Sequence, residues 1–177
     1  MARNQTKKSE ASKESFLYLL DILKVEMEIL ERTISRFDEM AQTTKNWTIT
    51  IWTGSLAIAL SQPEYRKYTL ITAIAPILFW YIDSYLRHLQ RRSYFRWQKI
   101  SEFLNSPKLA ESFENSQLVD FIVADVTAKQ YRDFDEYKRF VSKMRTFLFP
   151  EVATFYSVLT GISILMGLFF SLSRVAS

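Results

Sequence analysis

The chain has 177 residues and a formal net charge of +4, a length that corresponds to one domain with appendages. It contains no cysteine, one histidine and three glycines. These counts exclude disulfides, thiolate and multi-histidine metal sites and glycine-rich nucleotide loops, so we expect no metal and no cofactor. Because general acid–base groups are scarce as well, we expect a long-helix protein that is not an enzyme and has no catalytic residues.

Residues 1–12 are polar, lack the apolar core of a signal peptide and are predicted to be disordered. A helix is predicted for residues 13–45, because apolar residues recur there in a heptad pattern. The pattern consists of Phe16, Leu20, Leu23, Met27, Leu30, Ile34, Phe37 and Ala41.

Two partners are able to cover this heptad pattern. One is internal, because a helical extension of the second predicted span would lie beside it and offers Leu86, Leu89, Phe95 and Ile100. The other is a second copy of the chain, since a long heptad pattern also serves self-association. For that case the expected oligomer contacts in this helix are Leu23, Leu30, Ile34 and Phe37.

Three stretches contain no charged residue, namely 46–63, 68–82 and 152–173. A membrane-spanning helix needs about 20 mostly apolar residues, which the third stretch supplies alone and the second reaches if it extends to Leu86. Trp47 and Trp52 open the first stretch and Trp80 closes the second, as in the aromatic belts of membrane helices. We therefore predict an all-α membrane protein with a transmembrane hairpin at 46–86 and a third transmembrane helix at 151–173. The alternative is a soluble bundle with these stretches in its core.

Basic residues predict the orientation in the membrane. Five of them follow the second span without an acid between Asp83 and Glu102. The positive-inside rule therefore places residues 87–150 and the N-terminus in the cytoplasm, and the connector between the first two spans and the C-terminal tail outside.

Residues 87–150 are predicted to form a cytoplasmic helical region that completes a bundle or coiled-coil-like stalk with residues 13–45. The second span is expected to continue as a helix to Leu104, before the break at Pro107. The apolar stretch 118–126 is expected to be a short buried helix, because a lone strand has no sheet to join. Residues 132–149 are expected to be helical, with one face formed by Phe134, Tyr137, Val141, Met144 and Phe147 or Leu148.

Two groups of basic residues lie in this region, and Tyr94, Phe95 and Trp97 interleave with the first. In one interpretation they contact anionic lipid and fix the topology. In the other they bind a nucleotide or short oligonucleotide, whose phosphates meet the cations and whose bases stack on aromatic rings. The candidate ligand-binding residues are Arg87, Arg91, Arg92, Arg96, Lys99, Lys138, Arg139 and Lys143.

Polar and small residues also occur inside the predicted spans. Asp83 is expected either to pair with Arg87 on the same helix or to line a pore or gate. Thr50 and Thr53, in a span rich in threonine and serine, are further pore or gate candidates, or they form interhelical hydrogen bonds. Ser163 and Gly167 form a small-residue pair that lets helices approach closely, and they are expected oligomer contacts.

A resemblance to a known family rests on the run from Phe79 through Asp83 to Arg87, the arginine-rich helix that follows, and Phe155-Tyr156 at the start of the third span. These features resemble SLATT-type membrane effectors, which occur beside nucleotide-producing enzymes in bacterial anti-phage systems. The resemblance covers residues 46–104 and 146–170. It implies a protein of the bacterial inner membrane that permeabilises this membrane and halts the infected cell. One such arrangement, the Hailong system, pairs a small membrane effector with a nucleotidyltransferase whose oligonucleotide product gates it.

The leading hypothesis is therefore a homo-oligomeric membrane effector that forms or gates an ion-permeable pore under control of a nucleotide or oligonucleotide. Three spans are too few to enclose a pore, so a closed ring is expected, with a tetramer as the working number. The alternative is a non-conducting membrane scaffold that recruits a soluble partner through its heptad helix. The expected partners are the lipid bilayer, further copies of the chain, and a nucleotidyltransferase with its product.

Overall fold

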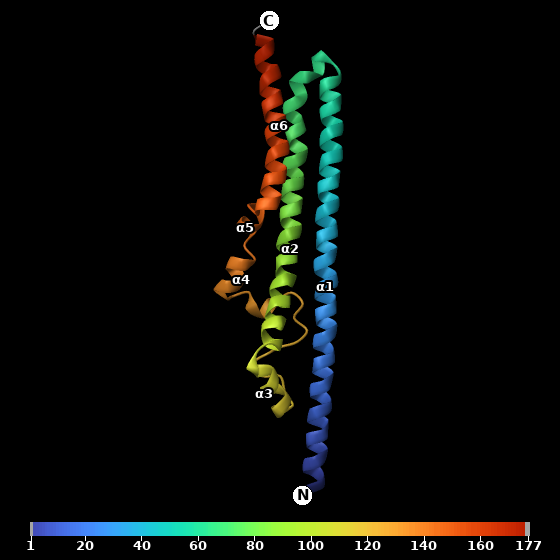
Figure 1. The fold of residues 1–177 in the computed structure, drawn as a ribbon, viewed down its shortest axis with the longest axis vertical. Coiled ribbons are helices and arrows are strands. Elements are labelled where there is room, and N and C mark those ends of the chain that lie inside the picture. The colour runs from blue at the N-terminus through green and yellow to red at the C-terminus, as the bar shows by residue number, and fades with distance from the viewer. Residues whose placement is uncertain (1, 176–177) are drawn as a thin grey trace. The chain divides into compact units, whose positions relative to one another are not determined.

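The computed structural model describes residues 2–175 (Figure 1). These residues form helices and connecting segments and contain no strand, as the sequence predicted. Met1 and residues 176–177, the end of the predicted external tail, lie outside the described residues. The helices are α1 (Ala2–Ser61), η1 (Pro63–Ala73), α2 (Ile74–Leu104), α3 (Pro107–Asn115), η2 (Lys129–Tyr131), α4 (Asp135–Phe140), α5 (Lys143–Phe147) and α6 (Pro150–Val175).

The chain forms two compact units. The first contains the described residues up to Arg36 together with Gln90–Val141. The second contains Phe37–Leu89 and the described residues from Ser142 onward.

α1 is a single helix whose ends follow from its sequence. Neither glycine nor proline occurs before Gly54, and each residue added to an existing helix gains one hydrogen bond, so nothing interrupts the helix. It ends at Ser61, just before Pro63, because the residue preceding a proline disfavours the helical conformation. α1 begins at Ala2 and so includes residues 2–12, for which the sequence predicted disorder.

In the first unit the heptad pattern packs against α2. Leu23 and Leu30 form one core cluster with Ile100 and Phe103. This confirms the internal partner predicted for the pattern, at Ile100. A second cluster consists of Phe95, Ala128, Tyr137 and Val141.

The apolar stretch 118–126 is not the short buried helix that the sequence predicted. Every fourth residue from 116 to 128 has a positive φ, which a right-handed helix does not allow. These residues are Ser116 (50°), Asp120 (51°), Ala124 (64°) and Ala128 (52°). The stretch still buries its apolar side chains, because Leu118, Phe121, Val123 and Val126 pack on the core cluster of α1 and α2.

Residues 132–149 also differ from the prediction of one helical face. They form the two short helices α4 and α5, separated at Ser142, which caps α5 by accepting a hydrogen bond from the Arg145 backbone N–H at 3.5 Å. Tyr137 and Val141 are buried, whereas Phe134 and Met144 are exposed. Residues on the two sides of Ser142 therefore belong to the faces of two different helices.

In the second unit, the end of α1, η1 with the first half of α2, and α6 run side by side (Figure 1). Two segments of the described chain are long and apolar enough to cross a membrane, one within Pro63–Leu104 and one within Asp135–Ser173. The first predicted span, 46–63, is not among them, since threonine and serine dilute its apolar residues. The structure thus supports two candidate spans where the sequence predicted three.

Candidate functional site

The predicted ligand-binding residues Arg87, Arg91, Arg96 and Lys99 make contacts within their own unit. In the first unit, Lys99 bonds to Glu102 (2.8 Å) and Glu136 (2.9 Å). Arg91 donates to the carbonyl of Phe140 (2.6 Å) and lies over its ring. The other two are Arg96, which pairs with Glu26, and Arg87 of the second unit, which pairs with Asp38 at 2.7 Å.

The remaining predicted cations differ in exposure. Arg92 is half-buried on α2. Lys138 and Arg139 are exposed in the last turn of α4, in the first unit. Lys143 is exposed at the first residue of α5, in the second unit. The cations available at the surface are therefore fewer than the sequence suggested.

Among the ion pairs between described residues, that of Glu26 and Arg96 is the most completely buried. Glu26 is 2% exposed and Arg96 is 0% exposed. Arg96 donates from Nε to Glu26 Oε1 (2.8 Å) and from Nη2 to Oε2 (3.0 Å). The same carboxylate accepts the backbone N–H groups of Ala124 (2.9 Å) and Asp125 (3.0 Å). Arg96 is therefore an internal structural residue.

Arg96 also reaches the irregular segment directly. Its Nη2 donates to the carbonyl of Ile122 at 2.6 Å, and its guanidinium lies 4.8 Å from the centre of the Phe121 ring. Tyr131 is another neighbour, and burial raises the pKa of its phenol although the cation opposes that shift. The ion pair and its hydrogen bonds thus hold residues 121–125 in their non-helical conformation.

The sequence patterns did not single out Glu26. One signal was available, because Glu26 lies three residues after Leu23 and four before Leu30 and so shares their helix face.

Asp83 is fully buried in the second unit. Arg87 Nε lies 4.0 Å from its carboxylate, and Lys45, Tyr156 and Glu151 also interact with it electrostatically. Arg87 makes its shorter contact with Asp38, so the predicted pairing on one helix is only part of a larger charge cluster. Because Asp83 has no exposed surface, it lines no open pathway within a single chain.

Ser163 joins three helical segments of the second unit. Its hydroxyl oxygen accepts hydrogen bonds from Trp52 Nε1 (2.8 Å) on α1 and from the Thr72 hydroxyl (3.0 Å) on η1. Gly167, one turn later on α6, packs against Leu70 so closely that a Cβ atom would overlap that side chain. These two predicted oligomer contacts therefore hold the chain's own helices together, as do Leu23 and Leu30 in the first unit.

The end of α1 has two different polar faces. Thr48 is buried and donates its hydroxyl to the carbonyl of Thr44. Thr50 and Thr53, the predicted pore candidates, are exposed and donate to carbonyls of their own helix. They belong to an exposed face of small or polar residues, the small polar face, which consists of Asn46, Thr50, Thr53, Gly54 and Ala57.

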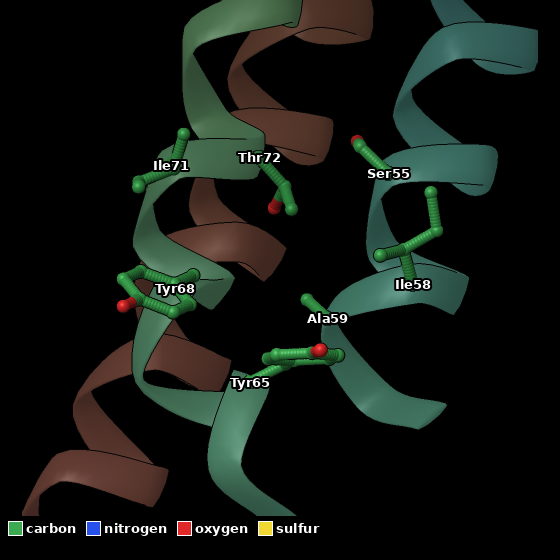
Figure 2. A pocket seen from close by; sticks show the side chains of 7 residues that line it. All are labelled: Ser55, Ile58, Ala59, Tyr65, Tyr68, Ile71 and Thr72. Atoms are coloured by element: carbon green, nitrogen blue, oxygen red, sulfur yellow. The ribbon is translucent and has the colours of Figure 1, made fainter. Parts of the chain in front are cut away.

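An apolar hollow of about 330 Å³ lies between α1 and η1. Figure 2 shows Ser55, Ile58 and Ala59 on α1 across from Tyr68 and Thr72 on η1. Tyr65 and Ile71 complete the lining. Hydrocarbon groups dominate this surface, so the hollow is suited to apolar groups and not to water or ions.

Comparisons with models of protein families, with curated proteins and with solved structures find no match for this chain.

Proposed function

We propose that the chain is a homo-oligomeric membrane effector that forms or gates an ion-permeable pathway, with three spans in each copy. The observation that carries the proposal is the small polar face of α1, which is exposed while Thr48, Thr72, Asp83 and Ser163 of the same unit are buried. In a bilayer, polar groups favour contact with another helix or with water over contact with lipid. A helix with this face is therefore suited to line a pathway between copies.

The properties of the interior of one chain support a pathway that is formed by several copies. Its hollow between α1 and η1 is apolar, and its buried carboxylate Asp83 has no exposed surface. A water-filled pathway then requires a ring of chains that turn their small polar faces toward a common axis. A tetramer is the working number.

The setting of the proposed effector comes from the resemblance to SLATT-type effectors. It implies a location in the bacterial inner membrane and a role in anti-phage defence through membrane depolarisation. The positive-inside rule favours an N-terminus in the cytoplasm. The proposed gating signal is an oligonucleotide made by a nucleotidyltransferase. Lys138 and Arg139 are its best-suited contacts, because both are exposed and Arg96 is buried in an ion pair. Binding through such cations weakens as the salt concentration rises.

Cysteine accessibility tests the proposed lining, and the chain is convenient for it because it has no cysteine of its own. Thr50→Cys and Thr53→Cys are reconstituted in liposomes and treated with a charged, water-soluble thiol reagent during ion-flux measurements. We expect modification to block the flux, since both positions face the proposed pathway.

Ile51→Cys and Ile58→Cys are the matched controls, because these side chains are also exposed on α1 but lie beside the small polar face. They should be modified slowly and without a change in flux. Equal effects at all four positions would remove α1 from the lining of the pathway.

A non-conducting scaffold is the second candidate, and a groove in the first unit favours it. The groove has a volume of about 340 Å³ and is lined mainly by Tyr18, Ile22, Val25, Ile29, Ala124 and Val126. Tyr18, Val25 and Ile29 are exposed, so this side of α1 has room for a partner helix. Liposomes that contain the purified chain and its ligand but show no ion flux would favour the scaffold.

A further inference from the structure

We propose that the second unit binds the phosphate group of an anionic amphiphile, such as an acidic phospholipid, in a pocket between α2 and α5. The pocket has a volume of about 250 Å³. It is lined by Tyr81, Ser84, Tyr85 and His88 of α2 and by Lys143, Met144 and Phe147 of α5. The proposal rests on the membrane location of this unit and not on ion conduction.

The wall of the pocket is fixed by Trp80. Its Nε1 donates to the carbonyl of Phe147 at 3.0 Å, and the two rings stack with their centres 4.6 Å apart and their planes 6° apart. Trp80 also stacks on Tyr156 of α6, with the ring centres 6.3 Å apart. The short helix α5 is therefore anchored to the two apolar helices, and the pocket exists before any ligand binds.

The Trp80–Phe147 contact also defines the direction of the pocket. Phe147 lies beside the apolar part of α2, and Lys143 lies one turn of α5 further from it. On α2, Ser84 lies about one turn and His88 about two turns from Tyr81. Lys143, Ser84 and His88 are the residues of the lining with polar side-chain groups other than a phenol, and Tyr81 and Phe147 contribute aromatic surface.

This arrangement matches an amphiphile at a membrane surface. The mainly apolar lining offers one lysine ammonium, and none of the lining residues is acidic. The nearby carboxylate of Asp83 interacts instead with Lys45, Arg87 and Tyr156. A lysine near the membrane surface attracts anionic lipid head groups.

The surroundings and the size of the pocket favour a lipid over a nucleotide. Tyr81, Tyr85, Met144 and Leu148 expose more than half of their surface around it, as suits residues at a membrane interface. Pockets for whole drug-sized ligands usually have volumes of roughly 300–1,000 Å³. This smaller pocket therefore suits a head group whose acyl chains remain outside, against the aromatic residues.

Native mass spectrometry of the full chain in detergent tests the proposal without any measurement of conductance. The probes are dioleoyl phosphatidylglycerol and dioleoyl phosphatidylcholine. We expect one phosphatidylglycerol to be retained in preference to phosphatidylcholine. Lys143→Gln should weaken that retention by about fivefold, the effect of one basic residue near an anionic head group.

Arg145→Gln is the matched control, because it removes an exposed cation of α5 that does not line the pocket, and it should retain the lipid like the parent. Millimolar inorganic phosphate identifies the source of the ligand: displacement of the lipid supports a site for free phosphate compounds, and no displacement supports a lipid site. The phosphate pocket is overturned if both variants retain phosphatidylglycerol like the parent, or if the parent binds phosphatidylcholine equally well.

Discussion

Replacing Arg96 by glutamine removes the cation from a carboxylate that is only 2% exposed. Glu26 would keep its two backbone donors and lose both bonds from the guanidinium. Breaking a buried ion pair from one side costs about 3–5 kcal/mol. We expect Arg96→Gln to lower the free energy of unfolding of the first unit by this amount and to expose residues 116–128 to proteolysis, which trypsin cleavage at Lys129 would report.

Arg36→Gln is the control, since Arg36 is exposed on the same long helix α1. Changes at exposed positions of this kind usually stay within about 0.5 kcal/mol. Trypsin resistance of Arg96→Gln equal to that of the parent would contradict the structural role of the pair and return Arg96 to the candidate ligand-binding residues.

At the scale of single residues, the sequence could predict helix faces but not the partners of charges. Leu23 and Leu30 are predictable because their spacing alone places them on one apolar face. The partner of Arg96 is not, because Glu26 lies 70 residues away in the chain. The burial of Glu26 depends on residues 121–125, and the ion pair itself stabilises the non-helical conformation of that segment.

At the scale of elements, the contact of α6 with η1 depends on Gly167. A Cβ atom at this position would overlap the Leu70 side chain and come within 3.2 Å of its backbone nitrogen. We expect Gly167→Leu to separate the two helices and to lower the thermal stability in detergent. Overpacking of this kind typically costs about 1–3 kcal/mol.

Gly161→Leu provides a control on the same helix, because a Cβ atom there meets nothing within 4 Å. Its thermal unfolding should resemble that of the parent. If both leucine variants unfold at the same temperature as the parent, α6 does not pack closely on η1.

The long helices could be predicted from the sequence, whereas the segment between α3 and η2 could not. α1 and α2 have long periodic apolar faces, and their interior helix breakers are Gly54 near the end of α1 and Pro76 in the first turn of α2. Residues 116–128 also contain an apolar stretch, but the positive φ values of this segment depend on distant partners. The Ser112 hydroxyl accepts the Val119 N–H (3.0 Å), and Glu26 accepts those of Ala124 and Asp125. The order of residues alone does not reveal such partners.

At the scale of the whole molecule, the number of spans depends on whether the end of α1 crosses the membrane. Its length permits this, but its threonines and serines keep it outside the two clearly apolar segments. Its contacts favour a third span, because Trp52 of α1 hydrogen-bonds to Ser163 of α6, to which Thr72 of η1 also bonds. A tryptophan indole and a buried serine that satisfy each other are suited to an apolar environment.

The side of the membrane on which Lys13 lies decides between two and three spans. With three spans, Lys13 and Lys108 are both cytoplasmic, whereas Tyr65 and Arg174 are outside; with two, Lys13 moves outside and the other three stay in place. We therefore expect an impermeant maleimide to label Tyr65→Cys and Arg174→Cys rapidly in spheroplasts, and Lys13→Cys and Lys108→Cys only after permeabilisation. Lys108→Cys serves as the internal control for membrane integrity in this experiment. Rapid labelling of Lys13→Cys in intact spheroplasts would exclude α1 as a span and, with it, the proposed lining of the pathway by Thr50 and Thr53.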